Sequence, residues 1–167
     1  MNADGTLALR APAHAEGVWP VEFERRAGRA SAVPAAVAPE MPDVENVYRA
    51  LVQGVRDYVG KHKFPGVVMG LSGGVDSALT LAIAVDALGA DRVHAVMMPT
   101  RYTADMSCDD AQEQAKILGV KYSVIPIEPL FETTLASLRE EFAGRPVDIT
   151  EENIQSRVRG LLLMALS

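Results

Sequence analysis

One segment constrains the fold of this chain more than any other: a short apolar run leads directly into a glycine-rich turn and a second apolar run. Residues 66–71 are almost all apolar, as in a strand buried on both faces of a sheet. Ser-Gly-Gly-Val-Asp-Ser follows at 72–77, and the apolar residues 78–88 end at Gly89, a residue type that often terminates helices. We therefore predict a buried strand, a tight turn and a buried helix.

The same alternation of strand and helix continues along the chain. Apolar runs at 93–98 and 122–127 predict two further strands. The helix expected between them begins at Ser107, with Asp110 completing a capping box, and ends at Gly119. Strands and helices that alternate with short connections are typical of a parallel sheet with right-handed crossovers. The predicted fold class is therefore α/β, a three-layer doubly wound parallel sheet.

The turn at 72–77 has the composition of an anion-binding loop. In an open α/β sheet, ligands bind beyond the carboxyl ends of the strands, where this turn is expected. Gly73 and Gly74 let the backbone approach a ligand, and N–H groups at the start of a helix favour an anion. Asp76 repels a bare phosphate but fits a site in which Mg²⁺ bridges carboxylate and phosphate oxygens. The turn lacks the lysine of a Walker A loop; a plain helix cap is the alternative.

An amino-terminal arm and three further helices complete the predicted elements. Two β-like patterns, at 6–10 and 18–24, predict short strands that cannot bury a core alone. Residues 27–42 are rich in Ala, Pro and Gly and are predicted to be a linker. The helices are expected from Asp43, which can cap the first of them, from Phe131 to Phe142, and from Thr150 to the end of the chain.

Composition argues against several classes of function. The chain has 167 residues and a net charge of −6 without a basic stretch, so no nucleic-acid partner is expected. No run reaches the roughly 18 apolar residues of a membrane helix, and neither a membrane partner nor a secretory signal is expected. Cys108, the single cysteine, fits a reducing cytoplasm and a small buried position. His14, His62 and His94 have no metal-ligand spacing.

Three segments together resemble a known family. Ser-Gly-Gly-Val-Asp-Ser after a strand is similar to the pyrophosphate loop of the N-type ATP pyrophosphatases. Within that superfamily, Met-Pro-Thr-Arg-Tyr-Thr-Ala-Asp-Met-Ser at 98–107 resembles the NAD synthetases in their glutamine-dependent form. Asp-Ile-Thr-Glu-Glu-Asn-Ile-Gln-Ser-Arg-Val-Arg-Gly at 148–160 resembles the same group. The likeness extends over 44–167 and implies an adenine nucleotide alpha hydrolase-like fold.

The resemblance implies a reaction and its ligands. In these enzymes the nicotinate carboxylate of deamido-NAD attacks ATP, pyrophosphate leaves, and ammonia then displaces AMP to give NAD. By motif, Asp76 would bind Mg²⁺, and Asn153 and Arg157 would bind deamido-NAD. Helical spacing puts Asn153 and Arg157 on one face with Gly160 and Met164, away from the apolar stripe of that helix. A solvated surface arginine is the alternative for Arg157. The residues implied for ATP binding are Gly70, Leu71, Ser72, Gly73, Gly74, Val75, Asp76 and Ser77.

Domain boundaries also follow from the resemblance. Residues 1–26 would be the end of a nitrilase-like glutamine amidase domain, 27–42 a linker, and 43–167 the amino-terminal part of the synthetase domain. The sequence holds neither the family's Thr-Thr-Gly-Asn-Lys-Ser-Glu type motif nor the Glu-Lys-Cys triad of the amidase. We therefore expect a piece of a longer cytoplasmic enzyme that forms a homo-oligomer, with a synthetase domain incomplete at its carboxyl end and little synthetase activity alone.

Several alternatives remain open at the level of sequence. The turn also suits another pyrophosphate-loop amidotransferase such as a GMP synthetase, a non-catalytic nucleotide-binding or interaction module, or an incomplete gene product. Met97 and Met98 would either contact adenine or pack in the core. Tyr102 lies in the loop that follows them, and Asp105, Asp109 and Asp110 would serve a site or only favour a helix start.

Overall fold

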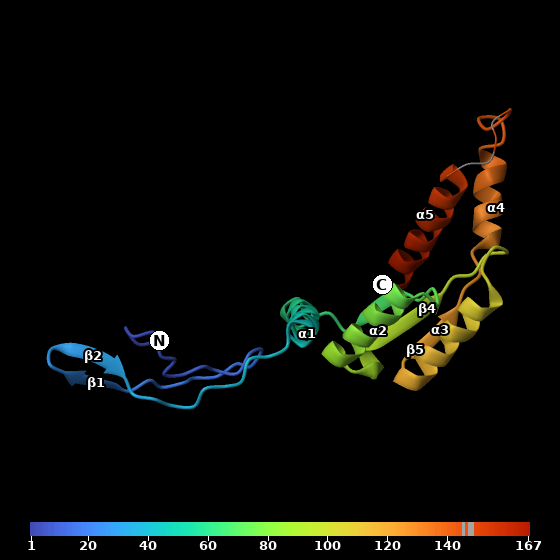
Figure 1. Cartoon of the computed structure of the whole chain (residues 1–167). Helices are drawn as coiled ribbons and strands as arrows, with labels where there is room; N and C mark the ends of the chain where they lie inside the picture. The colour runs from blue at the N-terminus through green and yellow to red at the C-terminus, as the bar shows by residue number, and fades with distance from the viewer. Residues whose placement is uncertain (145, 147–148) are drawn as a thin grey trace. The chain divides into compact units, whose positions relative to one another are not determined.

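The computed structural model describes residues 1–144, 146 and 149–167, which form two compact units, Met1–Gln53 and Gly54–Ser167 (Figure 1). The division falls inside the long helix α1 (Asp43–Lys61). Each unit is described by itself. Among the described residues, no helix has the length and apolar character needed to cross a membrane.

The first unit contains an antiparallel hairpin. β1 (Phe23–Arg26) pairs with β2 (Arg29–Ala32), and the two residues between them, Ala27 and Gly28, have φ values of 48° and 78°. Positive φ at both central residues matches the right-handed twist of the flanking strands. β2 lies within 27–42, the range predicted to be a linker, so that prediction is wrong at its amino-terminal end. The Ala-Gly pair has the composition of a linker but forms the turn of the hairpin.

The predicted strand at 6–10 is wrong. Residues 6–10 are all described, and the β pairing found among them is a single bridge from Arg10 to Val37. Of the second predicted strand, only the end is correct, since β1 begins at Phe23. Asp43 is the first residue of α1 rather than its cap.

The second unit is built on a parallel sheet, as predicted. Its strands are β3 (Val67–Gly70), β4 (Val93–Met97) and β5 (Lys121–Val124), in the order β3-β4-β5. Val67 lies opposite Val93, and His94 lies opposite Lys121. All three strands are shorter than predicted, but their parallel direction is confirmed.

Helices α2 (Val75–Leu88) and α3 (Asp105–Leu118) connect the strands. Both end at a glycine as predicted, Gly89 with φ 87° and Gly119 with φ 69°. A 3₁₀ turn, η1 (Ala90–Arg92), leads into β4. The capping box predicted at Ser107 is wrong, because α3 has already begun there and the Ser107 N–H donates to the carbonyl of Ala104 at 3.0 Å.

Alternating residues of the sheet contact helices on both faces. On one face, Val93, Ala95 and Met97 pack against α2 and α3. On the opposite face, Val96 packs with Val158 of α5 (Ile149–Leu166). The result is three layers, with helices on either side of a parallel sheet, and it confirms the predicted fold class.

The remaining helices frame the second unit. α4 (Glu128–Ser137) lies beside α5 (Figure 1) and is shorter than predicted, since it ends before Phe142. Arg56, in the second half of α1, holds that part of the helix to the end of α2. Its Nε donates to the carbonyl of Ala87 at 3.2 Å, and its Nη2 donates to the carbonyl of Asp86 at 3.1 Å.

Candidate functional site

The glycine-rich turn adopts a backbone path that glycine alone accommodates. β3 ends at Gly70, α2 begins at Val75, and Gly73 between them has φ 79°. A Cβ on Gly73 would lie 2.2 Å from the carbonyl oxygen of Ser107. The turn therefore packs directly against the first turn of α3, which a side chain at this position would prevent.

The two serines of the turn hold its shape. Ser77 Oγ donates to the carbonyl of Gly74 at 2.9 Å and accepts the N–H of Ser72 at 3.2 Å. The hydroxyls of Ser72 and Ser77 are 2.9 Å apart, and Ser72 Oγ also accepts the N–H of Gly74 at 3.3 Å. These bonds join the start of the turn to the first turn of α2.

The start of α2 is open to an anion. The first N–H groups of a helix have no intrahelical acceptor and carry partial positive charge. Gly74, the residue before α2, supplies no side-chain cap to them. Val75 is 80% exposed, and Asp76 is also exposed to solvent. A phosphate group can therefore approach these N–H groups from solution.

A cavity of about 390 Å³ lies beside this turn. It opens where the carboxyl ends of β3 and β4 meet, which is the position in which α/β sheets bind ligands. The lining residues are Gly70, Leu71, Ser72, Val96, Met97, Met98, Thr103, Arg159 and Leu163. The structure thus brings three of the predicted ATP-binding residues together with groups from β4, from the connection after it, and from α5.

Arg159 is the charged residue among the described residues that line this cavity, and it is not one of the predicted site residues. Its Nε donates to the carbonyl of Met98 at 3.2 Å, and burial lowers its pKa. An arginine stays protonated despite such a shift, and its planar guanidinium suits phosphate oxygens. The motif at 148–160 includes Arg159, but nothing in the motif distinguishes it from Arg157.

Three predicted site residues lie elsewhere. Asp76, Asn153 and Arg157 are exposed, and none of them is among the described residues that line the cavity. Asn153 and Arg157 share an exposed face of α5 with Gly160, as the helical spacing predicted. Asp148, the first residue of the family segment at 148–160, lies outside the described residues. The roles of the three exposed residues stay predictions.

A magnesium ion fits this site only with phosphate as a further ligand. Within the described ranges, no three His, Cys, Asp or Glu side chains gather as a metal-binding group. Mg²⁺ in nucleotide sites is often held by one or two carboxylates, phosphate oxygens and water. Asp76, exposed in the first turn of α2, can provide one such carboxylate.

Other singled-out residues have structural explanations. Met97 and Met98 are 3% and 6% exposed, so they pack in the core and also line the cavity. Asp105 is the first residue of α3, in agreement with its alternative role at a helix start. Cys108 packs against the core on the α3 side but is half-buried rather than buried.

Each of the three histidines bonds to a neighbouring polar group, and His14 Nε2 lies 2.7 Å from Asn46 Oδ1. His94 Nε2 lies 2.8 Å from Ser123 Oγ across β4 and β5, and burial, followed by the charge of Lys121, lowers its pKa. His62 Nδ1 lies 2.8 Å from the carbonyl oxygen of Tyr58. None of these histidines belongs to a metal-binding group among the described residues.

Comparison with known proteins identifies the family. A family profile described as NAD synthase matches residues 47–167. The chain belongs to the NAD synthase family. The glutamine-dependent NAD(+) synthetase of Rhodobacter capsulatus is 48% identical over 167 residues, and those residues correspond to 30% of that protein. The chain therefore spans about 30% of the length of such curated relatives.

Solved structures of NAD synthetases share the fold. The glutamine-dependent NAD+ synthetase from Acinetobacter baumannii, in complex with ADP, is 46% identical with a TM-score of 0.92, and the match covers 98% of this chain and 31% of that one. An NH3-dependent NAD synthetase from Campylobacter jejuni, in complex with nitrate, is 26% identical with a TM-score of 0.67. That second match covers 76% of this chain and 53% of the other.

Proposed function

We propose that this chain forms the pyrophosphate-binding part of a glutamine-dependent NAD synthetase. The whole enzyme would adenylate deamido-NAD with ATP and then amidate it, with ammonia released from glutamine. The observation that carries the proposal is the turn at 72–77, which presents the start of α2 beside the cavity at the ends of β3 and β4. A relative that is 46% identical over nearly the whole chain was solved with ADP, which supports a nucleotide at this site.

Different groups of the site would bind different parts of the ligands. The N–H groups at the start of α2 would bind phosphate oxygens, and charge that develops on the leaving pyrophosphate would be stabilised by donors already in place. Arg159, which also lines the cavity, would add a positive charge. Asp76 would hold Mg²⁺, which neutralises phosphate charge when it is bound. Asn153 and Arg157 would bind deamido-NAD from the exposed face of α5.

The wider setting belongs to the same proposal. Residues 1–26 would come from the amidase domain, 27–42 would link the domains, and 43–167 would begin the synthetase domain. The longer enzyme would form a homo-oligomer and work in the cytoplasm, where a chain with the single cysteine Cys108 would stay reduced. Its partners would be small molecules: ATP, deamido-NAD and ammonia.

Calorimetric titration of the chain with ADP, with and without Mg²⁺, tests the proposal. We expect binding that Mg²⁺ strengthens. Asp76→Asn should abolish that strengthening, while binding in the absence of Mg²⁺ should persist because a negative charge beside the phosphates is removed. Asp57→Asn, at an exposed aspartate of α1, is the matched control and should behave like wild type. No ADP binding by the wild-type chain, or the same Mg²⁺ effect in Asp76→Asn, would contradict the proposal.

A further inference from the structure

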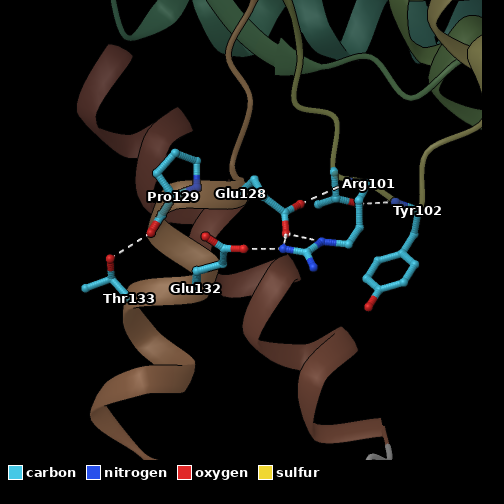
Figure 2. Close-up of polar contacts among 7 residues, drawn as sticks. Arg101, Tyr102, Glu128, Pro129, Glu132 and Thr133 are labelled. Atoms are coloured by element: carbon cyan, nitrogen blue, oxygen red, sulfur yellow. Dashed lines mark hydrogen bonds and ion pairs between the residues drawn. The ribbon is translucent and has the colours of Figure 1, made fainter.

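Arg101 connects three carboxylate oxygens at the start of α4, and the proposed function does not use it. Its backbone N–H donates to Glu128 Oε2 at 3.0 Å, and its Nε donates to Glu128 Oε1 at 2.5 Å. Its Nη2 forms ion pairs with both Glu128 and Glu132, as Figure 2 shows. Hydrogen bonds that Arg101 donates to Glu128 and then to Glu132 raise the pKa of Arg101, so the guanidinium keeps its charge here.

Arg101 lies in the 98–104 connection between β4 and α3, a segment with further fixed points. The N–H of Ile127 donates to the carbonyl of Pro99 at 3.1 Å, just before α4 begins. Thr100 and Thr103 close a turn around Arg101: the Thr100 N–H donates to Thr103 Oγ1, and the Thr103 N–H donates to the Thr100 carbonyl, both at 3.0 Å.

This turn contributes directly to the candidate nucleotide site. Thr103 lines the same cavity as Ser72. Arg101 itself is not among the described residues of that lining, and it bonds instead to the two glutamates of α4. Bonds that hold Arg101 in place therefore also hold Thr103 in place, because the two hydrogen bonds between Thr100 and Thr103 connect the two ends of the turn.

We propose that Arg101 is a positioning residue for nucleotide binding, which holds the 98–104 connection on Glu128 and Glu132 so that Thr103 closes the cavity beside Ser72. The inference rests on the proposed function, since it assigns a role in the same site. The three side chains are not deeply buried, with exposed fractions of 53%, 23% and 59% for Arg101, Glu128 and Glu132. Exposed ion pairs contribute little individually, so we expect an effect of about three- to tenfold on the ADP dissociation constant rather than unfolding.

The test uses the full chain and two readouts, hydrogen exchange of the peptide 98–104 and the ADP dissociation constant. Arg101→Ala should speed exchange in 98–104 and weaken ADP binding, with an unchanged far-ultraviolet circular dichroism spectrum. Arg101→Lys keeps the charge but lacks the planar fork that reaches two carboxylates, so both readouts should fall between wild type and Arg101→Ala. Arg139→Ala is the control, because Arg139 is exposed and has no ion pair within the described residues.

The outcomes separate this inference from the proposed function. Faster exchange together with weaker ADP binding in Arg101→Ala, but not in Arg139→Ala, would support the inference. If the wild-type chain binds ADP and Arg101→Ala matches it in either readout, the inference is overturned while the proposed function stands. Glu132→Gln in the Arg101→Ala background should add no further effect, and an additive effect would also overturn it. Absence of ADP binding by the wild-type chain would overturn both.

Discussion

Replacement of Gly73 by alanine perturbs the candidate site at the point where its backbone is most constrained. The added Cβ would lie 2.2 Å from the carbonyl oxygen of Ser107 and 2.7 Å from its Cα. Both are backbone atoms in the first turn of α3, so a rotation of a side chain cannot relieve the overlap. Either the turn at 72–77 or the start of α3 has to move.

Two contributions determine the size of the effect. A left-handed conformation, such as that of Gly73 at φ 79°, costs an L residue about 1–2 kcal/mol. Atoms forced into a filled site typically cost a further ~1–3 kcal/mol through displaced backbone. Gly73→Ala should therefore lower the free energy of unfolding by about 2–5 kcal/mol, which is a large part of the ~5–15 kcal/mol that stabilises a typical domain.

Urea unfolding followed by circular dichroism measures this loss, and Gly74→Ala is a matched control one residue away. Gly74 has φ −87°, and a Cβ there would meet Ser72 Oγ at 3.4 Å, an ordinary contact. The control should change the free energy of unfolding by less than about 1 kcal/mol. If the two variants unfold with free energies that agree within about 0.5 kcal/mol, the steric argument for the turn is refuted.

Three further predictions concern stability and pH. Gly54→Ala, inside α1 with no atom within 4 Å of the added Cβ, should stabilise the chain by about 0.5–1 kcal/mol; a lower urea midpoint would contradict this. Hydrogen bonds from the N–H and then from the side chain of Arg101 hold the pKa of Glu128 below its ordinary 4.5. These bonds therefore stabilise the folded chain fully above pH 4.5, and the stabilisation is lost as the pH falls through the lower pKa of the folded state. In Glu128→Gln, the free energy of unfolding should therefore depend less on pH at acid pH. Burial and then the charge of Lys121 lower the pKa of His94 below 6.5, so the contribution of neutral His94 to stability is complete above pH 6.5 and declines as the pH falls. Lys121→Gln should raise the pKa of His94 in an NMR titration. An unchanged pKa would count against the contact with Lys121.

The order of strands and helices in the second unit was predictable because it depends on each segment's own residues. Continuous apolar runs gave the buried strands, and Gly89 and Gly119 marked the ends of α2 and α3 correctly. The starts of the same helices were misplaced by two or three residues. Gly74 and Ala104 precede them, and neither has a polar side chain that could cap the first N–H groups, so the signal of a Ser, Thr, Asp or Asn cap is missing there.

The end of α4 was misplaced for a related reason. Apolar spacing continues to Phe142, yet the helix ends at Ser137. Hydroxyls in its second half bond back to carbonyls four residues earlier: Thr133 Oγ1 to Pro129 at 2.7 Å and Ser137 Oγ to Thr133 at 2.9 Å (Figure 2 shows the first). Such bonds slightly destabilise helices, and hydrophobic periodicity takes no account of them.

Arg157 and Arg159 mark the limit of what the sequence could predict about the site. Residues two positions apart on a helix point to different faces, so the two arginines cannot both face one cavity. Helical spacing alone placed Arg157 with Asn153 on the exposed face of α5, and the structure agrees with that placement. Arg159 lines the cavity because its Nε reaches the carbonyl of Met98, a backbone group at the end of β4. Every residue, proline included, offers a backbone carbonyl, so the type of residue 98 could not reveal this partner. Only the folded path of β4 and α5 separates the two arginines.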